Sequence, residues 1–270
     1  MKTVELKKYF DKTNQKVISS LLKSGDKHPV KTLHELRVEI KKIRFICNVI
    51  GHFNKSPDVE MLGKPYEEVF KKAGKIRSLQ MQKKLVSHFD ESDILKDLLK
   101  GNKHAEEKLM KKFFKDRELH ADILKAYKPM INAEIEKTIN PDLKRYANHL
   151  IKFLFDNIKT KINITDAHKH RKKIKELIFI GRFSKELHSY ISNRINFDSA
   201  DKLQEKIGGW HDKYELFKAI SKNSNDVKNS EQKKYRKAIR QIGNMINKDL
   251  DEIKLLVSDF HLNINLITLK

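Results

Sequence analysis

The sequence H-E-L-R-V-E-I-K-K-I-R-F at residues 34–45 recurs in altered form as H-K-H-R-K-K-I-K-E-L-I-F at residues 168–179, an offset of 134 residues. A second pair of words has the same offset, because G-K-I-R-S at residues 74–78 aligns with G-G-W-H-D at residues 208–212. This period is far longer than the 20 to 50 residues of stacked repeat arrays. The chain is therefore predicted to be a duplication of two similar halves, with pseudo-twofold symmetry.

The first stretch has the pattern of a helix that is apolar on one side and cationic on the other. At about 100° per residue, His34, Arg37, Lys41 and Arg44 share one face. The adjoining apolar stripe consists of Leu33, Leu36, Ile40, Ile43, Cys47 and Ile50. Such a helix buries its apolar side and presents a row of cations along its length.

The second stretch repeats this face with one change. His168, Arg171 and Lys175 occupy the equivalent positions, whereas Ile178 replaces Arg44. Arg182 stands one turn later, where the first copy has Asn48. A cationic row of this kind suits a linear polyanion, since successive phosphates can each meet a lysine or arginine.

The composition also favours a polyanionic partner. The chain has 58 Lys and Arg against 36 Asp and Glu, a formal net charge of +22 with its 12 histidines neutral. A field of this size attracts nucleic acid, inorganic phosphate chains or anionic membrane surfaces. A solvated lysine-rich surface without a polyanionic partner is the alternative interpretation.

Apolar residues recur at helical spacing along a chain with only nine glycines and five prolines, which predicts an all-α fold. Pro129 is expected to end a helix, and residues 130–140 to form a short connection between a first half (1–130) and a second half (140–260). Residues 223–230 are predicted to be a polar loop, and the alternating tail 260–270 to be extended. The expected helices span residues 4–23, 31–53, 57–88, 92–99, 104–128, 142–158, 165–192, 199–221 and 231–257.

The remaining composition indicates a cytoplasmic protein. Cys47 is the single cysteine, so no disulfide can form within the chain. The N-terminus M-K-T-V-E-L-K-K-Y-F lacks the apolar centre of a signal peptide. No stretch approaches the roughly 18 apolar residues that a membrane span requires.

These motifs resemble the CHAD domain, the conserved histidine α-helical domain. The resemblance rests on H-x-x-R-V-x-x-K-K-x-R-F, on a following helix with a G-x-x-R word, and on a second histidine pattern followed by I-G-G-W-H-D at residues 207–212. It covers nearly the whole chain. It implies two four-helix bundles related by a pseudo-twofold axis, with a basic central groove or pore that binds inorganic polyphosphate without catalysis.

The resemblance assigns the family's positions to residues of this chain. The histidine position falls on His34 and His168, the following arginine on Arg37 and Arg171, and the next basic position on Lys41 and Lys175. The third basic position falls on Arg44 in the first copy only.

The two glycine words depart from the family pattern. Ser78 stands where the first word has an acid, and His211 stands where the second word has an arginine. We interpret both words as packing positions between helices, not as ligand contacts.

Two further helices carry cationic faces that can line the same groove. They consist of Lys108, Lys111, Lys112 and Lys115 in the first half and of Lys233, Lys234, Arg236, Lys237 and Arg240 in the second. The alternative for these residues is a solvated basic face.

The sequence favours no catalytic site, metal or cofactor. His168 and His170 fall on different helix faces, and Glu134, Glu136 and Lys137 do not have the E-x-E-x-K spacing of a tunnel triphosphatase. A phosphate-binding G-x-x-x-x-G-K-[ST] loop is also lacking. A phosphate-chain-processing enzyme is therefore the weaker alternative.

Nucleic-acid binding is the stronger alternative, because the same cations suit a phosphodiester backbone. Against it, the sequence shows no base-reading module, and Phe45 and Phe179 are expected to pack. We therefore expect non-catalytic binding of inorganic polyphosphate, or of a related polyanion, in a protein associated with polyphosphate granules. The expected binding residues are His34, Arg37, Lys41, Arg44, His168, Arg171, Lys175, Arg182, Lys108, Lys112, Lys115, Lys233, Arg236, Lys237 and Arg240.

Overall fold

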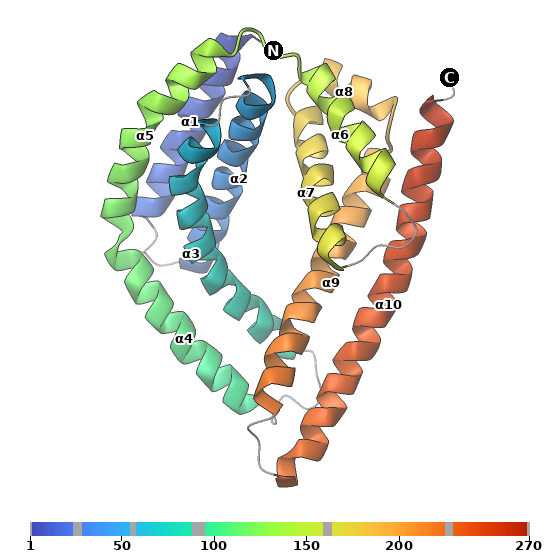
Figure 1. Ribbon diagram of the computed structural model, residues 1–270. Coiled ribbons are helices and arrows are strands. Elements are labelled where there is room, and N and C mark those ends of the chain that lie inside the picture. The colour runs from blue at the N-terminus through green and yellow to red at the C-terminus, as the bar shows by residue number, and fades with distance from the viewer. Residues whose placement is uncertain are drawn as a thin grey trace. The chain divides into compact units, whose positions relative to one another are not determined.

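The chain folds into two compact helical units (Figure 1). The computed structural model describes residues 2–23, 29–54, 58–87, 95–158, 164–224 and 229–268. Unit 1 comprises residues 1–81 and 99–142, and unit 2 comprises residues 82–98 and 143–270. All regular structure in the described residues is helical, so the expected all-α class is confirmed.

The helices follow the predicted order, but the predicted separate helices 92–99 and 104–128 are wrong, because one helix runs unbroken through residues 100–103 and the break lies at Asp116. Unit 1 is built from α1 (Thr3–Leu22), α2 (Pro29–Asn54), most of α3 (Asp58–Val86), most of α4 (Lys96–Lys115) and α5 (Arg117–Lys137). Unit 2 is built from α6 (Leu143–Asn157), α7 (Ile164–Gly181), α8 (Lys185–Ser192), α9 (Phe197–Ser224) and α10 (Asn229–Thr268). The described part of the chain contains no helix long and apolar enough to span a bilayer.

The predicted helix end at Pro129 is wrong. Helix α5 begins at Arg117, directly after α4, and continues through Pro129 to Lys137. Proline removes one backbone hydrogen bond at a cost of about 3 kcal/mol. Here Ile131 and Ile135 are fully buried beyond it, and burying two such side chains offsets that cost. The connection between α5 and α6 is therefore short, and it contains Asn140 with a left-handed φ of 42°.

The prediction of a single helix over residues 165–192 is also wrong, because this region forms two helices. Helix α7 ends at Gly181, and α8 begins after Ser184, whose hydroxyl oxygen accepts a hydrogen bond from the Leu187 amide at 3.1 Å. A serine cap of this kind stabilises a helix start by about 1 kcal/mol. The break lets the ring of Phe197 lie against Gly181.

Two further expectations concern the C-terminal region. The tail predicted to be extended is helical, because α10 continues to Thr268. Of the predicted polar loop, residues 223–224 end α9 and residues 229–230 begin α10. Residues 225–228 lie outside the described part of the chain.

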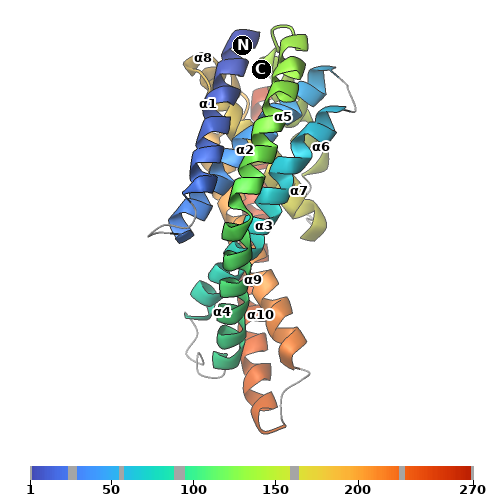
Figure 2. The ribbon, with the colours of Figure 1, turned by 90° about the vertical axis from the view of Figure 1, so that its left-hand side faces the viewer.

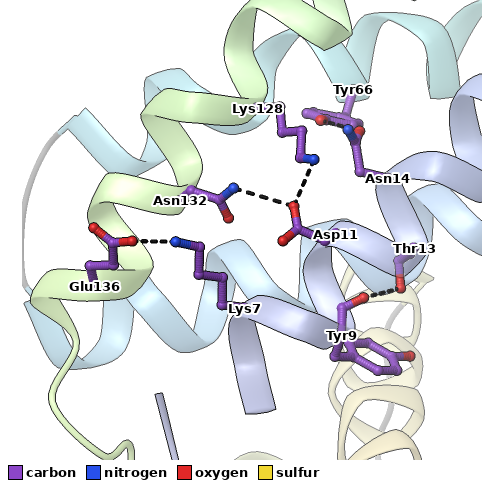
Figure 3. Close-up of polar contacts among 9 residues, drawn as sticks. All are labelled: Lys7, Tyr9, Asp11, Thr13, Asn14, Tyr66, Lys128, Asn132 and Glu136. Atoms are coloured by element: carbon purple, nitrogen blue, oxygen red, sulfur yellow. Dashed lines mark hydrogen bonds and ion pairs between the residues drawn. The ribbon is translucent and has the colours of Figure 1, made fainter. Parts of the chain in front are cut away.

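Helix α1 is the centre of the packing in unit 1 and lies along both α2 and α5 (Figures 1 and 2). Its buried residues include Leu6, Phe10 and Val17 at helical spacing, which explains its amphipathic sequence. Polar contacts surround this core (Figure 3). Asp11 accepts from Lys128 at 2.9 Å and from the Asn132 side-chain amide at 3.3 Å, and these contacts join α1 to α5.

Helix α9 is the corresponding centre of unit 2, because it packs against α7 and α10. Trp210 is its largest buried side chain. The buried carboxylate of Asp249 on α10 pairs with Lys206 at 2.9 Å and also with Lys213, both on α9. This buried ion pair joins the two longest helices of the unit.

An ion pair recurs in the two units with its charges exchanged. Glu39 and Lys42 pair on α2 at 2.5 Å. The residues 134 positions further on are Lys173 and Glu176, which pair on α7 at 3.2 Å. The interaction is retained although both partners differ, which is the result expected for duplicated halves that have diverged.

A size exchange occurs at another pair of equivalent positions. In unit 1, Cys47 on α2 faces Gly63 on α3, where a Cβ atom would lie 3.8 Å from the cysteine sulfur. In unit 2 the equivalent residues are Gly181 and Phe197, so the large residue is now on the other helix. The equivalent helix contact is thus filled by a side chain of the earlier helix in unit 1 and of the later helix in unit 2.

Candidate functional site

The first cationic cluster lies on α2 and α3 of unit 1. We define it as His34, Arg37, Lys41, Arg44 and Arg77. The first four residues share a face of α2, as the sequence predicts. Arg77 comes from α3, and its charge acts on both His34 and Arg37.

Arg37 is held in place by contacts with α3. Its Nη1 donates a hydrogen bond to the Phe70 carbonyl at 2.8 Å, and its guanidinium carbon lies 3.9 Å from the centre of the Phe70 ring. A Cβ atom at Gly74 would come within 2.5 Å of Nη1, so a larger residue there would displace the guanidinium from this position. Arg44 also approaches the Phe70 ring, at 5.1 Å. The first glycine word therefore makes space for the arginine of the histidine-led helix.

The charges that act on His34 and Arg37 are mostly positive. Burial, as the largest cause, and the charges of Arg77 and Arg44 together lower the pKa of Arg37 to about 10. The pKa of His34 is lowered by burial and then by Arg77, Lys41 and Arg37. Glu35 opposes this effect on His34 and is the weakest of the causes. A bound anion would relieve this mutual repulsion.

The second cationic cluster lies on α7 and α9 of unit 2. We define it as His168, Arg171, Lys175, Arg182 and His211. Arg171 Nε donates to the Gln204 carbonyl at 2.9 Å, and a Cβ atom at Gly208 would lie 2.7 Å from Arg171 Nη2.

This arrangement repeats the first cluster residue by residue. Arg171, Gln204 and Gly208 each lie 134 positions after Arg37, Phe70 and Gly74. Each arginine therefore donates to the backbone carbonyl at the equivalent position of the next helix and lies over the equivalent glycine. The interpretation of the glycine words as packing positions is confirmed for the two glycines.

Carboxylates act on two cations of the second cluster. Burial lowers the pKa of Arg171, and Asp212 opposes that shift. Burial also lowers the pKa of Lys175, with Arg171 and Arg182 acting in the same direction and Asp201 and Glu205 against it. The positive charge of the second cluster is thus partly balanced within unit 2.

The substitution of Ile178 for Arg44 has a structural counterpart. Ile178 is buried, so the position that holds a cation in unit 1 belongs to the core in unit 2. Arg182 follows the end of α7 and is exposed, and its charge acts on Lys175. The predicted shift of charge by one turn is therefore seen in the structure.

Comparisons with known proteins agree with the motif-based resemblance at the level of the fold. No protein-family model and no curated protein matches the sequence. Among solved structures, the chain is similar to the crystal structure of the CHAD domain from the plant Ricinus communis, with a TM-score of 0.60 and 14% sequence identity. The match covers 95% of this chain and 91% of that chain. The chain has a CHAD-like fold.

In this CHAD-like fold, the other predicted cations lie outside the two clusters. Lys108, Lys111, Lys112 and Lys115 are exposed on α4, and their side chains make no hydrogen bond or ion pair with another described residue. On α10, Lys233, Arg236, Lys237 and Arg240 are exposed as well, and nothing is described for the side chain of Lys234. These faces are exposed, so they can offer charge to a polyanion, and their part in binding stays a prediction.

Arg77 is the residue that the sequence interpretation missed. The sequence interpretation treats it as a packing residue of its glycine word, but its side chain has no hydrogen bond or ion pair with another described residue. Its position one turn after Gly74 is the signal that could have identified it. A residue three positions after a glycine that receives Arg37 lies on the same face of α3.

The two neighbouring histidines of the second CHAD-like motif have different environments. His170 is buried and lies 6.1 Å from the Phe153 ring, where it fills a core position. His168 lies 5.0 Å from His211, edge to face. The expected separation of His168 and His170 onto different faces is therefore confirmed.

Proposed function

We propose that this chain binds inorganic polyphosphate without catalysis, through the cationic cluster of each unit. The supporting observation is the environment of Arg37, a half-buried guanidinium whose pKa is lowered by burial and then by two other arginines. Burying like charges together is unfavourable unless an anion compensates them. Arginine suits this role because its planar group binds two phosphate oxygens at once.

These clusters suit a flexible chain of phosphates better than they suit the bases of a nucleic acid. Single-stranded nucleic acids usually bind by stacking on exposed aromatic rings. Here Phe45 is buried, Phe70 is covered by Arg37, and Phe179 packs edge to face against Phe183. Within the two clusters, the described side chains therefore offer cations and imidazoles and no free aromatic face.

The proposal includes no catalytic step. Phosphoryl transfer usually depends on carboxylate-held metal ions beside the phosphate. The charges that act on Arg37 come from other arginines, and the described residues contain no group of three His, Cys, Asp or Glu side chains placed to hold a metal ion. A phosphate-release assay on polyphosphate and on triphosphate, with and without divalent metal, tests this part of the proposal.

Competition distinguishes polyphosphate binding from nucleic-acid binding. We expect long-chain polyphosphate to stay bound when single- or double-stranded DNA is present in excess, because the clusters lack stacking surfaces. Binding is measured by fluorescence anisotropy of labelled polyphosphate at fixed salt concentration. The affinity is expected to fall as a power of the salt concentration, since counterions are released on binding. Displacement by DNA, mole for mole of phosphate, would show that the chain is a general phosphate-backbone binder.

A further inference from the structure

Helix α5 carries a row of apolar side chains on the side that faces away from its buried residues. Leu119 is 62% exposed, Ile123 37% and Met130 51%, and Ala126 is exposed as well. At about 100° per residue, these four side chains fall within about 60° of one another. We call them the exposed stripe. Leu124 on the other side of α5 is fully buried, so the helix already has a core face. A single exposed apolar residue is ordinary, but a contiguous row indicates an interaction surface.

The spacing of the exposed stripe is that of a helix seam in a coiled coil. Its members follow one another at intervals of four, three and four residues. A seam of this spacing packs along another helix. The midpoint of the stripe lies between residues 124 and 125, so a second copy of α5 in the opposite direction matches it about that point. Leu119 then meets Met130 of the second copy, and Ile123 meets Ala126, each contact occurring twice. A parallel pair would instead place Ala126 opposite itself.

The charges beside the exposed stripe also complement a second copy. Asp122 and Lys125 lie on one flank of the stripe, near its midpoint, and form an ion pair at 2.9 Å. In an antiparallel pair of helices, the same flanks of both copies face each other. Asp122 of each copy then lies near Lys125 of the other, so opposite charges meet across the contact. In a parallel pair this flank faces the opposite one, and these charges do not meet.

We propose that α5 is the contact surface of a homodimer, in which the exposed stripes of two copies pack antiparallel about a twofold axis. A twofold contact uses the same patch on both copies, as a stripe that matches itself requires. The stripe is about 17 Å long, so the dimer is expected to be weak. None of its residues belongs to the cationic clusters, so this inference goes beyond the proposed function and does not depend on it.

Analytical ultracentrifugation of the full chain tests whether the dimer forms. Measurements extend to about 500 µM because small contacts are weak, and about 0.3 M salt screens the repulsion between copies of net charge +22. The wild-type chain is expected to dimerise reversibly. Ile123→Glu is expected to weaken the dimer about tenfold or more, because each copy loses an apolar contact near the centre. Leu255→Glu on α10 removes a more exposed apolar side chain outside the stripe and should associate like the wild type.

Cross-linking in a Cys47→Ala background tests the direction of the helices. Leu119→Cys and Met130→Cys each place one thiol at an end of the stripe. In an antiparallel pair, positions 119 and 130 of the two copies are adjacent, so mild oxidation of an equimolar mixture should link the two variants. Neither variant alone should form a covalent dimer to a similar extent.

Charge variants test the pairing across the flank. Asp122→Lys leaves two cations beside the stripe and Lys125→Asp leaves two anions, so each variant is expected to repel its own copies. An equimolar mixture is expected to form a heterodimer about tenfold more tightly than either homodimer, because opposite charges then face each other.

The inference is overturned if the wild-type chain stays monomeric over this concentration range, or if Ile123→Glu associates as strongly as the wild type. Efficient cross-linking of Leu119→Cys to itself would show a parallel contact and would also overturn it. Thermal unfolding of each variant shows whether a weaker association reflects a changed fold, and the cysteine variants test the contact without a buried charge. Polyphosphate binding by Ile123→Glu is expected to equal that of the wild type, so the proposed function and this inference can fail separately.

Discussion

Replacing Arg37 and Arg171 together with alanine is expected to lower the affinity for polyphosphate by about two to four orders of magnitude. Each guanidinium is the central cation of its cluster, and losing one charged hydrogen-bonding group costs about 1.5 to 3 kcal/mol. The two losses arise in separate units, so their free energies are expected to add approximately. Binding is measured by calorimetry at low salt, where electrostatic contributions are largest.

This double variant is also expected to unfold at a lower temperature, because each arginine donates to a backbone carbonyl and fills the space above a glycine. Arg77→Gln separates the two effects, since it removes a cluster charge that has no described hydrogen bond. It should weaken binding about tenfold with little change in stability. Lys125→Gln with Lys218→Gln is a matched control, because it removes two exposed lysines outside the clusters. Equal losses in the control and in the cluster variants would mean that net charge alone determines binding.

Gly181→Ala is expected to lower the free energy of unfolding by about 2 kcal/mol, within the range for overpacking a filled site. The added Cβ would lie 2.3 Å from Cζ of Phe197, so the ring or the helix must move. This cost exceeds the gain of up to about 1 kcal/mol that alanine brings to a helix. Urea unfolding monitored by circular dichroism measures the change.

A double-mutant cycle and a nearby glycine provide the controls. Phe197→Ala removes the atoms that the new methyl group meets, so Gly181→Ala should cost much less in that background. Gly209→Ala adds a methyl group on α9 with no atom within 4 Å, and it should be neutral or stabilising. If Gly181→Ala behaves like Gly209→Ala, the contact with Phe197 does not constrain the end of α7.

The sequence was sufficient to predict the helices and the rows of cations on α2 and α7. Those features depend on periodicity, and a duplicated motif makes the periodicity visible twice. The helix boundaries that failed depend on contacts distant in sequence. Pro129 stays within α5 because the residues beyond it are buried, and α7 stops at Gly181 because Phe197 occupies the adjacent space.

The composition of the clusters was only partly predictable. The face of α2 follows from a helical wheel, but Arg77 and His211 belong to other helices, and their place in the clusters depends on the packing at Gly74 and Gly208. The carboxylates near Lys175 were missed for the same reason, since Asp201 and Glu205 are on α9. A wheel drawn for one helix cannot show charges contributed by its neighbour.

The exchanged pairs have a consequence for the history of the chain. A helix from one half cannot replace its counterpart in the other, because the large residue of each contact lies on a different helix in the two halves. Helix α2 carries the larger residue of its pair, Cys47, whereas α7 carries the smaller one, Gly181. Recombination between the two copies would thus be tolerated only when whole interacting helix pairs are transferred. Each half therefore depends on its own set of helix partners.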